Sequence, residues 1–114
     1  MRTAALFRNN EPLIPQVELA TQWWQRMWGL LGRASLAEGH ALFISPADSI
    51  HMFFMRFAID LIFVDRDLKV VKIVRRVRPW QLAFGGRNAH SVFELATGWL
   101  PEDAVELGDV LELR

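Results

Sequence analysis

Residues 50–63 read IHMFFMRFAIDLIF, a stretch in which three ionisable side chains interrupt eleven apolar ones. Alternation with a period of 2 predicts a strand over 49–55, and the next apolar run predicts a second strand over 59–64. The second strand is apolar on both faces apart from Asp60. This stretch therefore predicts a sheet that carries ionisable groups among apolar ones.

Apolar runs on both sides of this stretch indicate a β-rich chain. Residues 80–88, which include Gly85 and Gly86, are expected to form a loop, and Pro101 followed by two acids indicates one helical turn. Because the connections after residue 40 are too short for helical crossovers, we predict a strongly curved, mostly antiparallel sheet. Its closure is expected to give either a partly open barrel or a sandwich. The remaining strands are expected over 3–7, 17–19, 41–44, 68–77, 91–96 and 110–113.

One amphipathic helix is predicted near the N-terminus, over Ala20–Leu31. Thr21 is a suitable N-cap, and Gly32 stands where a helix commonly ends. The Trp, Met and Leu side chains of this segment share one arc, so we expect that face to pack against the sheet. The predicted fold class is α+β and β-rich.

Length and composition exclude several classes of protein. The chain has 114 residues, 13 basic and 13 acidic side chains and no cysteine, so we expect a single domain over 1–114. The lack of cysteine excludes a disulfide scaffold, a zinc ribbon, an iron–sulfur cluster and a thiol nucleophile. Balanced charge argues against a nucleic-acid partner. Neither a membrane span nor a signal-peptide core is visible, which predicts a soluble, cytoplasmic chain.

Arg56 and Asp60 flank the turn between the two central strands, so each can reach the other. A charge buried among apolar groups must be paired or hydrogen-bonded. One interpretation is an Arg56–Asp60 ion pair that fixes the strand register. The other is the polar floor of a pocket, in which the Arg56 guanidinium binds a carboxylate or a phosphate.

Three further residues complete the candidate site: His51, Glu94 and Arg33. His51 shares a strand face with Phe53 and Met55, where it is either a core residue or a base. Glu94 lies in the middle of an apolar strand and either points outward or lines the same cavity as Asp60. If both carboxylates point inward, the available counter-charges include Arg33, and acid–base chemistry becomes possible.

Other patterns are weaker. The three histidines lack the spacing of a metal site, so no metal or cofactor is expected, and no serine has a nucleophile-elbow context. The basic run 75–78 precedes Trp80, a combination found in single-stranded nucleic-acid sites. We favour a solvated edge strand whose charges discourage aggregation. Residues 85–88 are interpreted as a flexible loop rather than an anion-binding nest.

Four ordered blocks resemble the bacterial and archaeal family called domain of unknown function 192. They are RMWGLLGR with GHALF at 26–33 and 39–43, IHMFFMRFAIDLIFVD at 50–65, VFELATG at 92–98, and GD at 108–109. The resemblance covers residues 20 to 113 and implies a compact, curved, β-rich domain with a helix near its start. It implies no activity. Many members look exported or lipid-anchored, whereas this sequence shows no leader. The recurring polar positions of the family coincide with Arg26, Arg33, His51, Arg56, Asp60, Glu94 and Asp109.

The sequence supports three functional hypotheses. The favoured one is a non-catalytic binding module for a small anionic ligand or a peptide, with a pocket formed by Arg33, His51, Arg56, Asp60 and Glu94. An alternative is a hydrolase or lyase that uses Asp60 or Glu94 as its base and His51 as partner. A third is a protein–protein interaction module acting through exposed Trp side chains. A monomer or weak dimer is expected.

Overall fold

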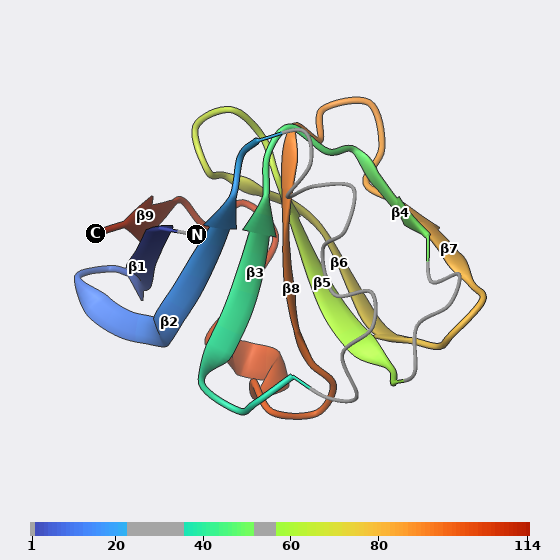
Figure 1. Ribbon diagram of the computed structural model, residues 1–114. Helices are drawn as coiled ribbons and strands as arrows, with labels where there is room; N and C mark the ends of the chain where they lie inside the picture. The colour runs from blue at the N-terminus through green and yellow to red at the C-terminus, as the bar shows by residue number, and fades with distance from the viewer. Residues whose placement is uncertain (1, 23–35, 52–56) are drawn as a thin grey trace.

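The computed structural model of the chain describes residues 2–22, 36–51 and 57–114; the side chains of residues 50 and 51 are not described. These residues form strands and one short 3₁₀ helix, η1 (Figure 1). The elements are β1 (Arg2–Arg8), β2 (Glu11–Ala20), β3 (His40–Ile44), β4 (Ser49–His51), β5 (Ile59–Val64), β6 (Val70–Val77), β7 (Leu82–Phe84), β8 (Ser91–Ala96), η1 (Glu102–Ala104) and β9 (Leu111–Leu113).

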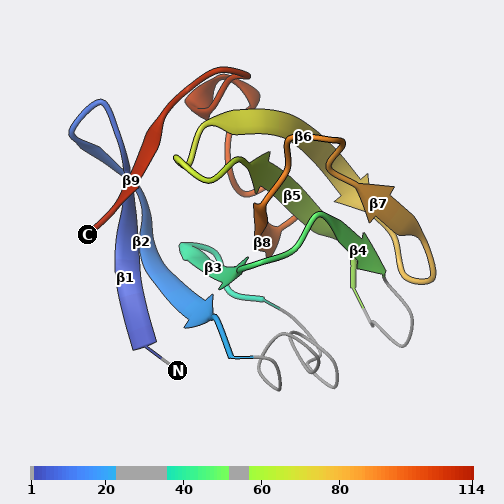
Figure 2. The same cartoon turned by 90° about the horizontal axis from the view of Figure 1, so that it is seen from above.

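Seven strands form one sheet in the order β6-β5-β8-β3-β2-β1-β9, and β4 pairs with β7 in a separate two-stranded sheet. The large sheet curls until its two edge strands meet at one end (Figure 2). There the Val70 amide donates to Asp109 O at 2.8 Å, and the Leu111 amide donates to Leu68 O at 3.0 Å. The result is a β-rich half-barrel, which agrees with the predicted partly open barrel.

Both faces of this sheet are apolar because its central strands are covered on both sides. Along β8, Phe93 and Leu95 belong to one buried cluster, whereas Val92 belongs to the other. Successive side chains of a strand point to opposite faces. The run over 41–44 is apolar throughout, and those over 59–64 and 91–96 are apolar apart from Asp60, Ser91 and Glu94. These three runs therefore correspond to strands buried on both faces.

The pair β2–β3 is parallel, whereas the other strand pairs of the described residues are antiparallel. A parallel pair needs a crossover connection of about a dozen residues or more, and residues 21–39 supply it. The predicted helix Ala20–Leu31 falls mostly within 23–35, which lies outside the described residues. Its predicted start is wrong, because Ala20 ends β2 and pairs with Ile44. The only helical segment among the described residues is η1.

The structure corrects two other boundaries and leaves a third untested. The strand expected at 17–19 is part of the longer β2, and the loop expected over 80–88 contains β7. The strand predicted over 49–55 is observed as β4 over Ser49–His51, and residues 52–56 lie outside the described part. The helical turn predicted at Pro101 is confirmed as η1, with Pro101 immediately before its first residue.

Candidate functional site

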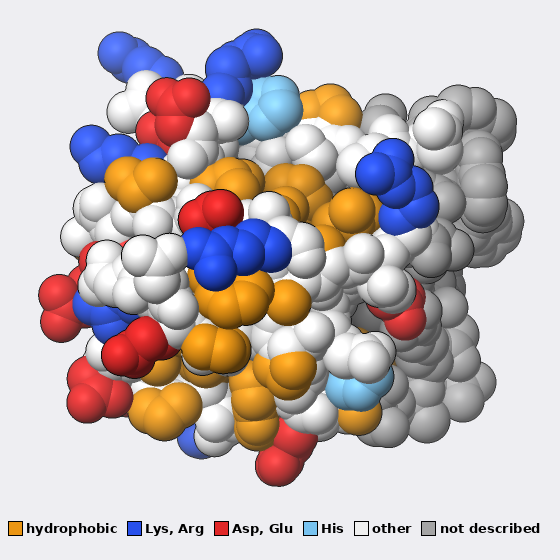
Figure 3. Space-filling view, turned by 90° about the vertical axis from the view of Figure 1, so that its left-hand side faces the viewer, with side chains coloured by type: hydrophobic (Ala, Val, Ile, Leu, Met, Phe, Trp, Pro, Cys, Tyr) orange, Lys and Arg blue, Asp and Glu red, His pale blue; other side chains and the backbone are white. Residues whose placement is uncertain are grey.

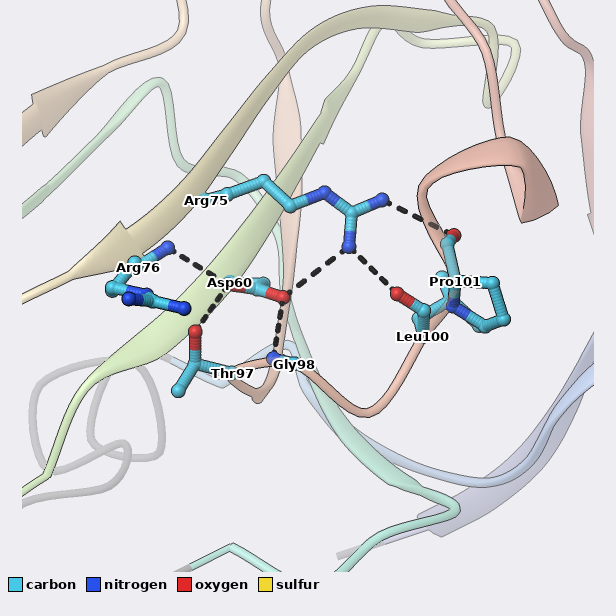
Figure 4. Close-up of polar contacts among 7 residues, drawn as sticks. All are labelled: Asp60, Arg75, Arg76, Thr97, Gly98, Leu100 and Pro101. Atoms are coloured by element: carbon cyan, nitrogen blue, oxygen red, sulfur yellow. Dashed lines mark hydrogen bonds and ion pairs between the residues drawn. The ribbon is translucent and has the colours of Figure 1, made fainter.

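A buried carboxylate at the start of β5 organises the most extensive polar cluster of the described residues. Asp60 is 2% exposed and lies on the strand flanked by β6 and β8. Its Oδ1 accepts hydrogen bonds at 2.8 Å from the Arg76 amide and the Thr97 hydroxyl. Its Oδ2 accepts from the Gly98 amide at 3.2 Å and from Arg75 Nη1 at 3.4 Å (Figure 4). Four donors from two segments therefore satisfy one carboxylate.

Asp60 also holds a β-bulge in β6. The pairing changes from Ile59↔Val77 to Leu61↔Val74, so two residues of β6, Arg75 and Arg76, oppose Asp60. Arg76 has a φ of 56°, a left-handed backbone conformation that residues other than glycine seldom adopt. The bond from its amide to Asp60 stabilises that conformation. Bulges re-aim side chains and recur next to functional sites.

Arg75 connects the same cluster to the chain that follows β8. Its Nη1 donates to Leu100 O at 2.8 Å as well as to Asp60, and its Nη2 donates to Pro101 O at 3.3 Å. Figure 4 shows the guanidinium between the carboxylate on one side and these two carbonyls on the other. Asp60 and Arg75 together fix the start of the β8–β9 connection against the sheet.

A hollow of about 450 Å³ lies beside this cluster. The half-buried Arg75 and the exposed Arg76, Thr97 and Glu102 side chains border it. The Arg76 guanidinium takes part in none of the described hydrogen bonds and ion pairs. The hollow thus combines one arginine held in place with one arginine available to a ligand.

Glu94 lies on the opposite face of the sheet from Asp60. Glu94 is paired in register with Leu61 and Leu42, whereas Asp60 is paired with Leu95. Leu61 and Leu42 belong to one apolar cluster and Leu95 belongs to the other. Glu94 is buried and makes a polar interaction of its own, so it does not point outward. The hypothesis that both carboxylates line one cavity is not supported.

The other predicted site residues are outside the described part of the chain. Arg33 and Arg56 belong to the segments 23–35 and 52–56, and the His51 side chain is likewise not described. His51 contributes its backbone to β4, opposite Leu82. The predicted Arg56–Asp60 pair stays a prediction. The described ion-pair partner of Asp60 is Arg75. The sequence analysis placed Arg75 on a solvated edge strand, because no sequence pattern indicates the β-bulge that turns it toward Asp60.

A second arginine–aspartate pair holds the far end of the β8–β9 connection. Arg8 Nε lies 2.9 Å from Asp109 Oδ2, and Arg8 Nη1 donates to Ala104 O at 2.7 Å. Figure 3 shows this end of the molecule, where acidic and basic side chains lie side by side among hydrophobic ones. Sequence reasoning singled out Asp109 but missed Arg8, because the two residues lie far apart in the chain.

Neither a metal site nor a serine nucleophile activated by a histidine finds support in the described residues. No group of three His, Asp or Glu side chains there is placed to hold a metal ion. His90 Nδ1 lies 2.9 Å from Ser91 Oγ, and Ser91 Oγ donates to Ser45 Oγ at 2.7 Å, which commits all three groups to one another. Within the described part of the chain, no helix is long and apolar enough to cross a membrane.

Sequence comparison relates the chain to proteins without an assigned activity. A model of the DUF192 family, described as "Uncharacterized ACR", matches residues 5–113. A UPF0127 protein from Pyrococcus abyssi is 36% identical over 103 residues, which are 85% of this chain and 85% of that protein. Another from Thermococcus sibiricus is 33% identical over 85% of this chain and 65% of its own length.

Two crystal structures have the same fold. A protein of unknown function from Novosphingobium aromaticivorans superimposes with a TM-score of 0.81 and 20% identity, over 96% of this chain and 83% of that one. A proposed transcription regulator from Sinorhizobium meliloti superimposes with a TM-score of 0.80 and 24% identity, over 97% and 92%. At this identity the likeness shows the fold alone.

Proposed function

The chain belongs to the DUF192 family of uncharacterised proteins, which brings no activity with it, and we propose that it is a non-catalytic binding module for a small anionic ligand. We place the binding site at the hollow beside Asp60. A carboxylate or phosphate group of a free small molecule, or the C-terminal carboxylate of a peptide, has the chemistry that this site accepts.

One observation carries the proposal: the bulge held by Asp60 places Arg76 at a hollow with its guanidinium free of described partners. A guanidinium presents a planar fork of donors that matches a carboxylate or a phosphate. Asp60 holds the backbone of Arg76 and the side chain of Arg75, so these two parts of the site are arranged before a ligand arrives. Such preorganisation lowers the entropic cost of binding.

The saturation of Asp60 favours binding over catalysis. A general base needs a lone pair directed at the substrate and within hydrogen-bond reach of it. Asp60 already accepts four hydrogen bonds from the protein, and Glu94 lies on the other face of the sheet. These contacts weaken the hydrolase or lyase alternative for both carboxylates and leave Asp60 as the support of the arginines.

The test is a thermal-shift titration with phosphate, acetate, succinate and citrate at constant ionic strength. A ligand present at ten times its dissociation constant stabilises the folded state by about 1.4 kcal/mol, which raises Tm by about 5 °C in a domain of this size. We expect at least one of these anions to raise the Tm of the wild type. Arg76→Ala should abolish the shift, because it removes the guanidinium.

Arg78→Ala is the matched control, since Arg78 is also exposed but does not border the hollow. It should keep the full shift. The binding proposal is refuted if the wild type and the Arg76→Ala variant respond equally to every anion, or if neither responds.

A further inference from the structure

Three large hydrophobic side chains are exposed along and just before β7. Trp80 is 60% exposed, Leu82 is 55% exposed and Phe84 is 58% exposed. Ala83 between the last two is buried, so strand alternation puts Leu82 and Phe84 on the same outward side. We call Trp80, Leu82 and Phe84 the β7 stripe. Clustered exposed hydrophobic groups of this size mark interaction sites more often than single ones do.

The turn before β7 is held by specific hydrogen bonds rather than left loose. The Arg78 amide donates to Gln81 Oε1 at 2.7 Å, and the Gln81 amide donates to Arg78 O at 3.1 Å. Within this turn Trp80 has a φ of 71°, a conformation that a bulky residue seldom adopts unless its surroundings impose it. At the other end, Lys72 Nζ donates to Phe84 O at 2.7 Å and ties β7 to β6. The stripe is therefore presented on a fixed backbone.

The stretch of sequence that contains the stripe carries charge of a single sign. Between Asp67 and Glu94 there is no acidic residue, yet this segment carries six of the 13 basic side chains. Arg76 and Arg78 are exposed at the end of β6 and in the turn that leads into β7. The exposed Asp48 lies beside the other end of β7, where its carbonyl accepts from the Gly85 amide at 2.8 Å. The positive charge is therefore concentrated at the Arg76–Arg78 end of the stripe. Local fields of one sign steer partners of the opposite sign.

We propose that the β7 stripe is a docking surface for an acidic peptide segment of a partner protein, one that also carries apolar side chains. The apolar side chains of the segment would cover Leu82 and Phe84, and its carboxylates would face Arg76 and Arg78. The middle position of the stripe is Leu82, an aliphatic side chain on which a base cannot stack, and this favours a peptide over single-stranded nucleic acid. The inference shares Arg76 with the proposed anion site, but its apolar contacts at Leu82 and Phe84 do not require an anion in the hollow beside Asp60.

The test is fluorescence anisotropy with a fluorescein-labelled decapeptide in which Asp and Glu alternate with Leu and Phe. We expect saturable binding that Leu82→Ser combined with Phe84→Ser weakens at least tenfold. Leu107→Ser is the matched control, because Leu107 is also an exposed large hydrophobic residue but lies between η1 and β9. It should leave the affinity unchanged. All three side chains are exposed, so the variants should keep the wild-type circular dichroism and Tm.

Charge reversal separates a local contact from general electrostatic attraction. Arg78→Glu should weaken the peptide at least threefold more than Arg2→Glu, which changes the net charge equally but lies on β1. Equal losses would overturn the proposal, as would unchanged binding in the Leu82/Phe84 double variant. Tighter binding of labelled oligothymidylate than of the peptide, lost in the same double variant, would also overturn it in favour of nucleic acid. An Arg76→Ala variant that loses anion binding but retains the Leu82/Phe84 dependence would separate the two proposals.

Discussion

Each end of the connection between β8 and β9 is held by an arginine–aspartate pair, but the two pairs have different surroundings. At its start, Arg75 joins Asp60 to the carbonyls of Leu100 and Pro101. At its far end, Arg8 joins Asp109 to the carbonyl of Ala104. In both places an aspartate orients an arginine, and the arginine binds backbone oxygens that no strand satisfies.

The two pairs differ in burial and in the number of donors to the aspartate. By distance alone the Arg8–Asp109 pair looks the stronger, but burial and donor number favour Arg75–Asp60. The Arg8–Asp109 pair is the shorter, at 2.9 Å against 3.4 Å for Arg75–Asp60. The Asp60 side chain is only 3% exposed, however, whereas that of Asp109 is 19% exposed. Removing a buried acceptor costs the protein every hydrogen bond that the acceptor receives, and Asp60 receives four. We therefore expect the longer pair, Arg75–Asp60, to contribute more to the stability of the fold.

The largest expected effect is that of Asp60→Ala. Breaking a buried ion pair by removing one partner costs about 3–5 kcal/mol, and here two backbone amides and a hydroxyl lose their acceptor as well. We expect a loss in this range in urea denaturation monitored by tryptophan fluorescence. Asp60→Asn should also destabilise, because an amide has one acceptor oxygen in place of two. A loss below about 1 kcal/mol for Asp60→Ala would contradict the assigned role.

The second prediction concerns Asp109→Asn, which should cost only about 1 kcal/mol. Partly exposed ion pairs contribute little because water competes for both partners, although the Glu106 amide also donates to Asp109 Oδ2 at 2.7 Å. The same denaturation experiment measures it. A loss equal to that of Asp60→Ala would show that burial does not separate the two pairs.

The smallest effect is expected at Glu112, at the C-terminal strand. Hydrogen bonding and then Coulombic attraction from Arg114 lower the pKa of the Glu112 carboxyl below its ordinary value. A lowered pKa adds stability above the ordinary value and loses it as pH falls through the lowered one. Because both groups are exposed, Glu112→Gln should leave the unfolding free energy unchanged within error. An NMR titration should find the lowered pKa, and Arg114→Ala should return it to the ordinary range.

Much of the strand content followed from the sequence, because alternation and continuous apolar runs report burial directly. The runs at 41–44 and 59–64 became β3 and β5 within one residue at each end. The strand at 82–84 was missed, because the neighbouring Pro79 and the Gly85–Gly86 pair indicate a loop. The long β2 was missed in part because Pro12 and Pro15 interrupt its pattern. Proline is tolerated at such positions when no ladder hydrogen bond from its nitrogen is required.

The candidate site was predictable only in part. An ionisable residue in an apolar run identified Asp60 correctly as a buried polar centre, since such a group must find partners. Its donors lie 15 to 38 residues away on strands whose register no local pattern encodes. The bulge that brings Arg75 and Arg76 opposite Asp60 is likewise a property of the pairing between β5 and β6.

The sequence by itself determined that this chain folds as a curved, β-rich sheet with buried polar groups, because hydrophobic periodicity is a local property of each strand. Only the tertiary structure decided which groups meet. Strand pairing put Asp60 and Glu94 on opposite faces, although both lie within apolar strands. Strand pairing also joined the two edges of the curled sheet at one end, through hydrogen bonds between residues 68–70 and 108–111. Long-range register depends on the packing of the whole sheet, which acts on all strands at once.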